Sequence, residues 1–289
     1  MPVYNGEKYI AHTLDSLLGQ TLTDFELIIS DNGSIDATET ICREYALKDS
    51  RIRYIRHPVN RGAAWNWNYV VHQARGTFLK WASSNDYCDA RMLEKCTAVL
   101  LNDERVALCY PLTYMVAEDG SREVYTGDID VPEDTPSQRF IHIRQHLLMN
   151  NAQAGVIRLS ALRRTRLERS YPHSDMILMA ELALYGKYRL LPEPLFFRRN
   201  DKQFMSHKLS PDELVHFIDP TRHPRFTLVS VSRHIDSIWS VLRARIGPKG
   251  TSEALRYIAK RAYRERRAIY RELAILLGIR RLPRPIHSG

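Results

Sequence analysis

Three short polar loops in the first third of the chain carry residue types that could bind a ligand. They are Tyr4-Asn5-Gly6, Asp31-Asn32-Gly33-Ser34 and Ser83-Ser84-Asn85-Asp86. Each follows a segment with the pattern of a β-strand, and open parallel sheets bind ligands where the carboxyl ends of their strands meet. Strand-to-helix turns favour Asn, Asp, Gly and Ser for conformational reasons alone, so a single loop of this kind says little. Three in succession, each at a strand end, predict a binding site.

The elements that must position these loops alternate between strand and helix. Short apolar runs at 25–30, 52–55 and 78–82 predict strands, and the apolar periodicity before and between them predicts amphipathic helices. This alternation favours βαβ units on a mostly parallel sheet, an α/β fold. Such a sheet normally opens with a buried strand, yet Met1-Pro2-Val3 supplies only the last residues of one. We therefore expect the first strand to be truncated or unusually short.

The order and spacing of several motifs resemble those of the family 2 glycosyltransferases. The resemblance is strong over residues 1–100 and looser up to about residue 210. The matching segments are Pro2-Val3-Tyr4-Asn5, Asp31-Asn32-Gly33-Ser34-x-Asp36, Asn60-Arg61-Gly62 and Ala74-Arg75-Gly76, followed by Gly155-Val156-Ile157-Arg158, Ser174-Asp175 and Arg198-Arg199. The resemblance implies the GT-A fold and transfer of a sugar from a nucleotide-sugar donor, commonly with inversion at the anomeric carbon. We expect this domain at 1–210, followed by a helical, basic extension at 211–289.

The resemblance also assigns roles in donor binding. It places the loop with Asp31 and Asn32 under the nucleotide base, where planar hydrogen-bond partners are needed, and we expect Asp31 to be exposed to the cleft. The shared position at strand ends adds Tyr4, Asn5 and Asn85 to the predicted donor site. It places Asn60 and Gly62 near the donor together with Arg75. A guanidinium there could offset the charge of the diphosphate, but Arg75 could equally be a solvated helix end.

The metal position departs from the family pattern. The family usually has Asp-x-Asp-Asp after the strand, with a carboxylate on Mg²⁺ or Mn²⁺, where this chain has Ser83-Ser84-Asn85-Asp86. Hard cations prefer charged oxygen ligands. Asp86 is therefore the expected carboxylate ligand, and Asn85 the weaker neighbour through its carbonyl oxygen.

An inverting transfer needs a base that takes the proton of the acceptor hydroxyl. The resemblance assigns this role to Asp175. The alternative is that Ser174 or Asp175 caps the helix that follows, and both roles are compatible. Glu181, in the same helix, is expected to be structural or at the surface.

The basic character of the chain is concentrated at its C-terminal end. The net charge is +9, and the segment from Lys249 to Gly289 holds 11 Lys and Arg against three Glu, so the rest is near neutral. A nucleic-acid enzyme would spread positive charge around its cleft, and we expect no nucleic-acid partner. A basic amphipathic helix over 252–277 either contacts an anionic membrane surface or packs on the catalytic domain. With no signal peptide, no membrane-spanning run and four cysteines expected as free thiols, the protein is expected in the cytoplasm or at the inner membrane face.

The function expected from these features is sugar transfer in the synthesis of a cell-surface polysaccharide or similar glycan, with a glycan or lipid-linked acceptor. Two alternatives stay open. The degenerate motif with Ser83 and Asn85 suits a catalytically impaired protein that binds nucleotide sugars. A nucleotidyltransferase would also have a Rossmann-like sheet, but its usual Gly-rich basic loop is not supplied by Asn5-Gly6-Glu7-Lys8.

Overall fold

A computed structural model describes residues 1–200, 209–224 and 227–279 of the chain. The strands are β1 (Pro2–Val3), β2 (Leu27–Asp31), β3 (Ile52–Arg56), β4 (Phe78–Lys80), β5 (Tyr87–Cys88), β6 (Val106–Val116), β7 (Arg122–Val124), β8 (Val156–Arg158) and β9 (Lys187–Arg199). The helices are α1 (Ile10–Leu18), α2 (Thr38–Lys48), α3 (Ala63–Gln73), α4 (Met92–Asn102), α5 (Pro136–His146), α6 (Leu159–Leu162), α7 (Ser174–Ala183), α8 (Pro211–Ile218), α9 (Val229–Ala244), α10 (Gly247–Arg264) and α11 (Arg266–Leu276), with a 3₁₀ turn η1 (Asn151–Ala154).

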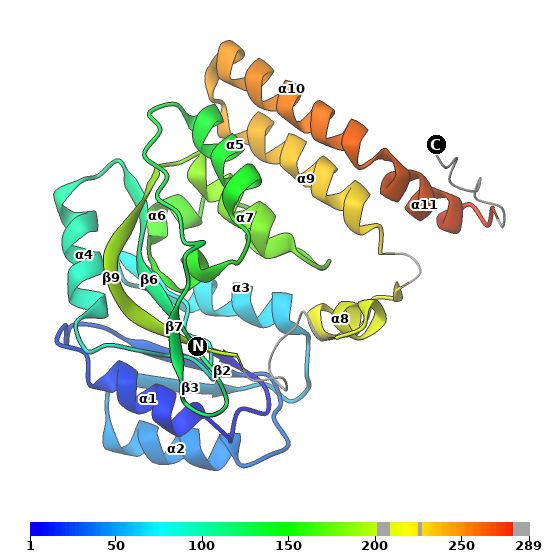
Figure 1. The fold of residues 1–289 in the computed structure, drawn as a ribbon. Helices are drawn as coiled ribbons and strands as arrows, with labels where there is room; N and C mark the ends of the chain where they lie inside the picture. Colours follow the sequence, from blue (N-terminus) through cyan, green and yellow to red (C-terminus); the bar gives the residue numbers. More distant parts are fainter. Residues whose placement is uncertain (201–208, 225–226, 280–289) are drawn as a thin grey trace.

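The first 60 residues form the parallel sheet that the sequence predicts. Its strand order is β1-β2-β3, and the register pairs Pro2 with Ser30 and Leu27 with Ile52. All five residues of β2 are buried, because α3 covers one face of this sheet and α1 and α2 cover the other (Figure 1). The strand expected to be short, β1, has two residues. All three carboxyl ends therefore lie at one edge.

The second sheet is mixed rather than parallel. Its order is β4-β8-β6-β9-β5, with β7 paired to β6; only β6 and β9 run parallel, and the other pairs are antiparallel. The two sheets share a core, since Val3 and Ile29 of the first belong to one cluster with Cys109 and Val156 of the second. The four cysteines, all in the described part of the chain, are buried and form no disulfide, as the sequence predicts.

The C-terminal helices pack on the sheet-containing part. Val241 of α9 and Ala254 and Ile258 of α10 are buried in the same apolar cluster as residues of α5 and α7. The boundary expected at residue 210 therefore does not separate two cores. The helix expected over 252–277 is two helices that meet at Glu265, whose carboxylate accepts hydrogen bonds from Arg233 and Arg261. No helix within the described residues has the length and apolar character needed to cross a membrane.

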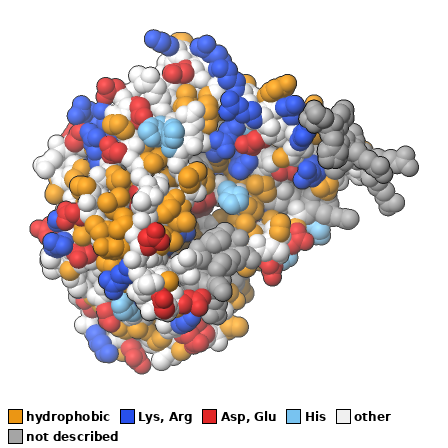
Figure 2. Space-filling view, in the orientation of Figure 1, with side chains coloured by type: hydrophobic (Ala, Val, Ile, Leu, Met, Phe, Trp, Pro, Cys, Tyr) orange, Lys and Arg blue, Asp and Glu red, His pale blue; other side chains and the backbone are white. Residues whose placement is uncertain are grey.

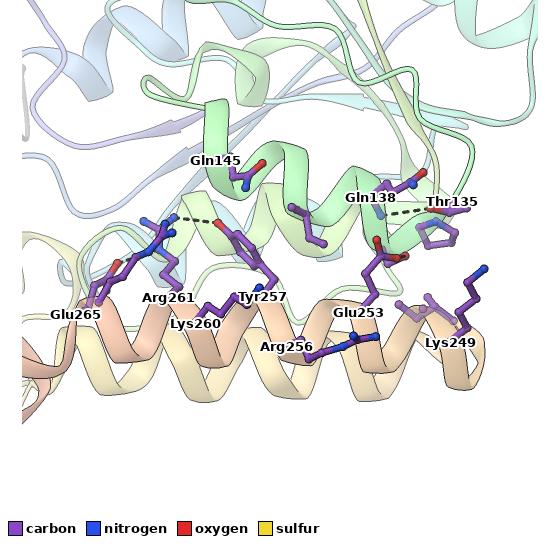
Figure 3. A pocket seen from close by; sticks show the side chains of 16 residues that line it. Thr135, Gln138, Gln145, Lys249, Glu253, Arg256, Tyr257, Lys260, Arg261 and Glu265 are labelled. Atoms are coloured by element: carbon purple, nitrogen blue, oxygen red, sulfur yellow. Dashed lines mark hydrogen bonds and ion pairs between the residues drawn. The ribbon is translucent and has the colours of Figure 1, made fainter.

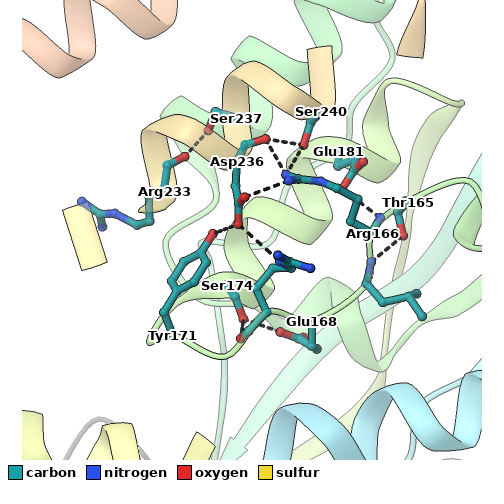
Figure 4. Close-up of polar contacts among 12 residues, drawn as sticks. Thr165, Arg166, Glu168, Tyr171, Ser174, Glu181, Arg233, Asp236, Ser237 and Ser240 are labelled. Atoms are coloured by element: carbon teal, nitrogen blue, oxygen red, sulfur yellow. Dashed lines mark hydrogen bonds and ion pairs between the residues drawn. The ribbon is translucent and has the colours of Figure 1, made fainter. Parts of the chain in front are cut away.

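A buried carboxylate on α9 fastens this helix to the loop that leads into α7 (Figure 4). Asp236 is 6% exposed, and it accepts hydrogen bonds from Arg166 Nη1 at 2.8 Å and from the Tyr171 hydroxyl at 2.7 Å. Arg166 also donates to the Asp236 carbonyl at 2.6 Å and to the Ser240 hydroxyl at 3.2 Å. Because these hydrogen bonds are several and largely buried, they fix the position of the loop relative to α9.

Replacing Asp236 by Ala leaves the half-buried Arg166 without its principal acceptor. Removing one member of a buried ion pair costs about 3–5 kcal/mol of unfolding free energy, and we expect a loss of this size in urea denaturation. The exposed Asp24 offers a control, because Asp24→Ala at the surface should change the unfolding free energy by less than about 0.5 kcal/mol. Equal effects of the two substitutions would contradict the anchoring role of Asp236.

Candidate active site

The first two predicted loops are joined by hydrogen bonds at the carboxyl edge of the parallel sheet. Asn5 adopts a left-handed backbone with φ of 51°, which Asn tolerates well. Its backbone N–H donates to Ser34 Oγ at 2.9 Å, and its side-chain oxygen accepts from the N–H of Ile35 at 3.0 Å. Tyr4 is 41% exposed beside them. The structure thus brings Tyr4 and Asn5 next to the loop that starts at Asp31.

Asp31 lies in this loop but is not exposed to a cleft, contrary to the expectation that accompanied its role in donor binding. Its side chain is fully buried. One carboxylate oxygen accepts from the backbone N–H of Ser34 at 2.8 Å, and the other from the Tyr54 hydroxyl at 2.6 Å. Burial and this hydrogen bond raise the pKa of Tyr54 well above its usual range. Asp31 therefore stabilises the loop, and its removal should cost stability as well as any contact with a base.

Asn32, Asn60 and Gly62, which the sequence predicts to lie near the donor, form one hydrogen-bonded group. The Asn32 amide donates to Asn60 Oδ1 at 2.8 Å and to the Gly62 carbonyl at 3.1 Å, while Asn60 Oδ1 also accepts from the N–H of Gly62 at 2.9 Å. Gly62 has φ of 88°, and a Cβ atom there would collide with the carbonyl of Ile218 at the end of α8. A glycine is required both by the backbone conformation and by the close approach of α8.

Arg75 does not belong to this group. It follows the C-terminal end of α3, and its backbone N–H donates to the carboxylate of Glu26 at 2.7 Å. Glu26 immediately precedes β2, so Arg75 lies at the amino edge of the strands, opposite the loops described above. Arg75 is thus an exposed residue at a helix end, and the structure does not bring it to the loops where donor binding is predicted.

The loop Ser83–Asp86 is tied to the end of β9. Asp86 Oδ1 accepts from the backbone N–H of Arg199 at 3.0 Å, and the Asp86 carbonyl accepts from Thr13 Oγ1 at 2.7 Å. Asn85 Oδ1 accepts a short hydrogen bond from Ser83. Burial raises the pKa of Asp86, and the charges of Arg198, Lys80 and Arg199 oppose this shift. The expected metal ligand thus lies among cations.

Asp175 lies in the first turn of α7, but the helix uses neither Ser174 nor Asp175 as its cap. The N-cap residue is His173, with a left-handed φ of 65°, and no side-chain cap hydrogen bond forms in this helix. The carboxylate of Asp175 instead accepts from Asn150 Nδ2 at 2.9 Å. The capping alternative is therefore wrong, and the carboxylate is held by a side chain from a distant segment.

Glu168 is a second carboxyl group beside Asp175 that carries no sequence motif. It accepts hydrogen bonds from Gln153 at 2.8 Å and from the Ser174 hydroxyl at 2.7 Å. Burial, with a contribution from the negative charge of Asp175, raises the pKa of Glu168 to about 8. Glu168 is therefore mostly protonated at neutral pH.

A chain of contacts connects this pair of carboxyl groups with the Ser83–Asp86 loop. Arg199 binds Asp86 through its backbone, and the neighbouring Arg198 donates to Asn151 Oδ1 at 2.7 Å. Asn151 is adjacent to Asn150, which holds Asp175. The positions of Asp86 and Asp175 are thereby fixed relative to each other.

The sequence predicts that Glu181 is structural or at the surface; the structure shows a buried, structural residue. It is 2% exposed in α7 and accepts from the backbone N–H of Arg166 at 3.2 Å. Its pKa is raised by burial, which is consistent with a role in packing.

The donor set for a metal ion is sparse. Among residues 1–200, 209–224 and 227–279, no group of three or more His, Cys, Asp or Glu side chains is arranged to hold a metal ion. Asp201, a further carboxylate near this site in the sequence, lies outside the described residues. Within the described residues, the candidate ligands for a metal ion at this site are the Asp86 carboxylate and the amide oxygen of Asn85.

Comparison with known proteins identifies the family. The model of the family described as glycosyl transferase family 2 matches residues 1–170, which is more than half of the chain. The chain belongs to this family, as its motifs predict, and membership excludes the nucleotidyltransferase alternative.

Curated relatives match over the N-terminal part. The uncharacterized glycosyltransferase EpsJ of Bacillus subtilis is 38% identical over 97 residues, 34% of this chain and 28% of that protein. The chondroitin synthase of Escherichia coli is 31% identical over 121 residues, 42% of this chain and 18% of that protein. The chain thus spans well under half the length of these relatives.

Solved structures share the fold. The crystal structure of S. aureus TarS 1-349 in complex with UDP-GlcNAc has a TM-score of 0.65 at 18% identity, covering 94% of this chain and 78% of that one. The mannosyltransferase PcManGT from Pyrobaculum calidifontis, in complex with GDP-Man and Mn²⁺, has a TM-score of 0.56 at 14% identity, covering 96% and 72%. These likenesses establish the GT-A fold that the sequence predicts.

The raised pKa of Glu168 predicts a pH-dependent stability. Because the folded protein holds this proton more tightly than the unfolded chain, whose Glu titrates near about 4.3, the stabilisation is complete below that pH and is lost as the pH rises towards about 8. Glu168→Gln should flatten the pH profile of the unfolding free energy in this window, by at most about 1.4 kcal/mol per pH unit. The exposed Glu104, changed to Gln, is the control. An unchanged profile in the Glu168 variant would show that Glu168 titrates normally.

Proposed function

We propose that the protein transfers a sugar from a nucleoside diphosphate sugar to a hydroxyl group of an acceptor, with inversion at the anomeric carbon. The observation that carries this proposal is the held carboxylate of Asp175, connected through Asn150, Asn151 and Arg198 to the loop of Asp86. An inverting transfer requires a base on one side of the sugar and a site for the departing diphosphate on the other. A base at Asp175 and a diphosphate site at Asp86 would meet that requirement, and the chain of contacts between them supports this assignment.

The donor is bound at the carboxyl edge of the parallel sheet in this proposal. The nucleotide contacts Tyr4, Asn5 and the turn formed by Asn32, Asn60 and Gly62. Asp31 stabilises the loop through the hydrogen bonds of its buried carboxylate. The complexes of TarS with UDP-GlcNAc and of PcManGT with GDP-Man support a nucleotide-sugar donor.

The chemical step is a single displacement. The acceptor oxygen forms a bond to the anomeric carbon while the bond from that carbon to the diphosphate oxygen breaks, and the electron pair leaves with the diphosphate. Asp175 takes the proton of the acceptor hydroxyl. Protonated Glu168 beside it does not compete for that proton, and Asn150 orients the carboxylate.

A divalent cation fits this site weakly. Mg²⁺ in proteins is often bound by one or two carboxylates together with substrate phosphates and water, and Asp86 with Asn85 would hold it in that manner. When bound, the cation would neutralise charge on the diphosphate. Arg198 and Arg199, whose charges act on Asp86, can contribute to the same neutralisation. The Mn²⁺ complex of PcManGT supports use of a metal.

The proposed acceptor is a growing glycan. A chondroitin synthase among the relatives supports a role in polysaccharide synthesis. The alternative of a nucleotide-sugar-binding protein without turnover rests on Ser83 and Asn85 in place of acidic residues, and it predicts donor binding with no transfer.

Asp175→Asn tests the catalytic base. Loss of a general base lowers the rate by about 10²–10⁴-fold, and the amide can still accept the hydrogen bond from Asn150, so we expect turnover to fall by this factor while donor affinity changes little. Donor affinity is measured by isothermal titration, and turnover by release of the nucleoside diphosphate in the presence of acceptor. Asp24→Asn is the surface control. Near-normal turnover of the Asp175 variant would exclude Asp175 as the base.

Asn85→Asp tests the cation site. A second carboxylate beside Asp86 should tighten Mn²⁺ binding, since charged oxygens are better ligands for hard cations than amides. Titration with Mn²⁺ in the presence of nucleoside diphosphate measures the change, and Asn85→Ala provides the opposite comparison. Equal Mn²⁺ affinity in all three proteins would mean that residue 85 does not face the cation, and full activity of the parent protein in EDTA would remove a metal from the mechanism.

A further inference from the structure

A large groove lies between α5 and α10, away from the donor loops (Figure 3). Its volume is about 1140 Å³. Gln138, Ile141 and Gln145 line it from α5, and a row of long polar side chains lines it from α10. This size exceeds what a single ion requires and suits an extended ligand.

The two walls of the groove are held together near both ends. Ser137 Oγ of α5 donates to Glu253 of α10 at 2.6 Å, and Arg261 Nη1 of α10 donates to the carbonyl of Arg144 at 2.6 Å. Because both ends are pinned, the groove does not depend on a ligand to form. A preformed site loses little conformational entropy on binding.

The groove is strongly basic. Of its lining residues, five are cations and two are acids: Lys249, Arg256, Lys260, Arg261 and Arg264 against Glu253 and Glu265. Both acids are already engaged, Glu253 by Ser137 and Glu265 by Arg233 and Arg261. Figure 2 shows Lys and Arg side chains gathered over the part of the surface where α10 lies.

Four of the cations are exposed along one helix. Lys249, Arg256, Lys260 and Arg264 are all exposed, and they extend over about 22 Å of α10. Near the C-terminal end of α5, burial and the neighbouring charge of Arg261 lower the pKa of Arg144 to about 10. Like charges this close favour binding of an anion, which would relieve their repulsion.

A short segment connects the α5 wall of the groove with the residue that holds the proposed base. Helix α5 ends at His146, and Asn150, which donates to Asp175, follows four residues later. Leu148, between them, is 78% exposed. This connection relates the groove to the proposed acceptor side of the site.

We propose that the α5/α10 groove binds an extended, negatively charged glycan chain, which is the distal part of the acceptor. This inference rests on the proposed function and adds the chemical class of the acceptor. The concave shape favours a chain over a flat bilayer surface. The amides of Gln138 and Gln145 and the hydroxyl of Tyr257 supply the hydrogen-bonding groups that sugar hydroxyls require.

The test uses the full chain and a fluorescent alginate decasaccharide, an acidic glycan, with an uncharged dextran oligosaccharide of similar length for comparison. We expect the alginate to bind, and binding to weaken as salt is raised. The double variant Arg256→Gln/Lys260→Gln should bind alginate about 2- to 30-fold more weakly, since each exposed ion pair contributes a factor of roughly 1.4 to 5. Circular dichroism verifies that the variants fold.

A matched control removes the same charge outside the groove. Arg267 and Arg271 are exposed on α11 and do not line the groove, so Arg267→Gln/Arg271→Gln should leave alginate affinity unchanged. Equal weakening by both double variants would show a general effect of the basic tail and overturn the proposal. Equal binding of dextran and alginate would also overturn it.

A third arm separates the glycan from a membrane surface. Vesicles of phosphatidylcholine and phosphatidylglycerol are sedimented with each protein. Sedimentation that depends on Arg256 and Lys260, without alginate binding, would assign the groove residues to lipid headgroups and overturn the proposal. Nucleotide-sugar binding is titrated in the same proteins: its absence in the parent chain would contradict the proposed function, whereas its presence with unaltered alginate binding in the groove variant would contradict only the present inference.

Discussion

The attachment of Asp236 to Arg166 and Tyr171 is the interaction on which the geometry of the site depends. The loop between α6 and α7 carries Glu168 and leads into the first turn of α7, where Asp175 lies, and it contains no strand or helix of its own. Asp236 reaches it from α9, 65 and 70 residues away from Tyr171 and Arg166 in sequence. The C-terminal helices therefore form part of the structure that positions the carboxylates, and they are not an independent appendage.

Electrostatics divides the site into two regions of opposite character. Beside Asp175, burial raises the pKa of a second carboxyl group, that of Glu168, to about 8. Around Asp86 the balance is reversed, because Arg198, Arg199 and Lys80 surround a single carboxylate. Asn150, which donates to Asp175, and Asn151, which accepts from Arg198, join the two regions without adding charge. This arrangement suits a reaction in which a proton is accepted on one side and a diphosphate departs on the other.

The sequence predicts best what local pattern and family motifs determine. The parallel strands, the loop of Asn32 and the turn at Gly62 are each encoded by residues near one another in the chain. Glu168 and Asn150 could not be predicted in this way, because their contacts join segments with no motif of their own. Arg75 was misplaced because a motif at a helix end does not tell which edge of the sheet that end reaches. The exposure expected of Asp31 failed because the Tyr54 hydroxyl, from the neighbouring strand, covers it.

The close approach of α8 to Gly62 bears on how such proteins diversify. The carbonyl of Ile218 occupies the space that any side chain at position 62 would need, so the turn at Gly62 and helix α8 are in direct steric contact. A substitution at residue 62 therefore affects the packing of α8, and a change in α8 affects the turn at residue 62. Exchange of C-terminal segments between family members would therefore alter the shape of the proposed donor site along with the α5/α10 groove. Recombination that preserves both must carry residue 62 and α8 together as one inherited unit.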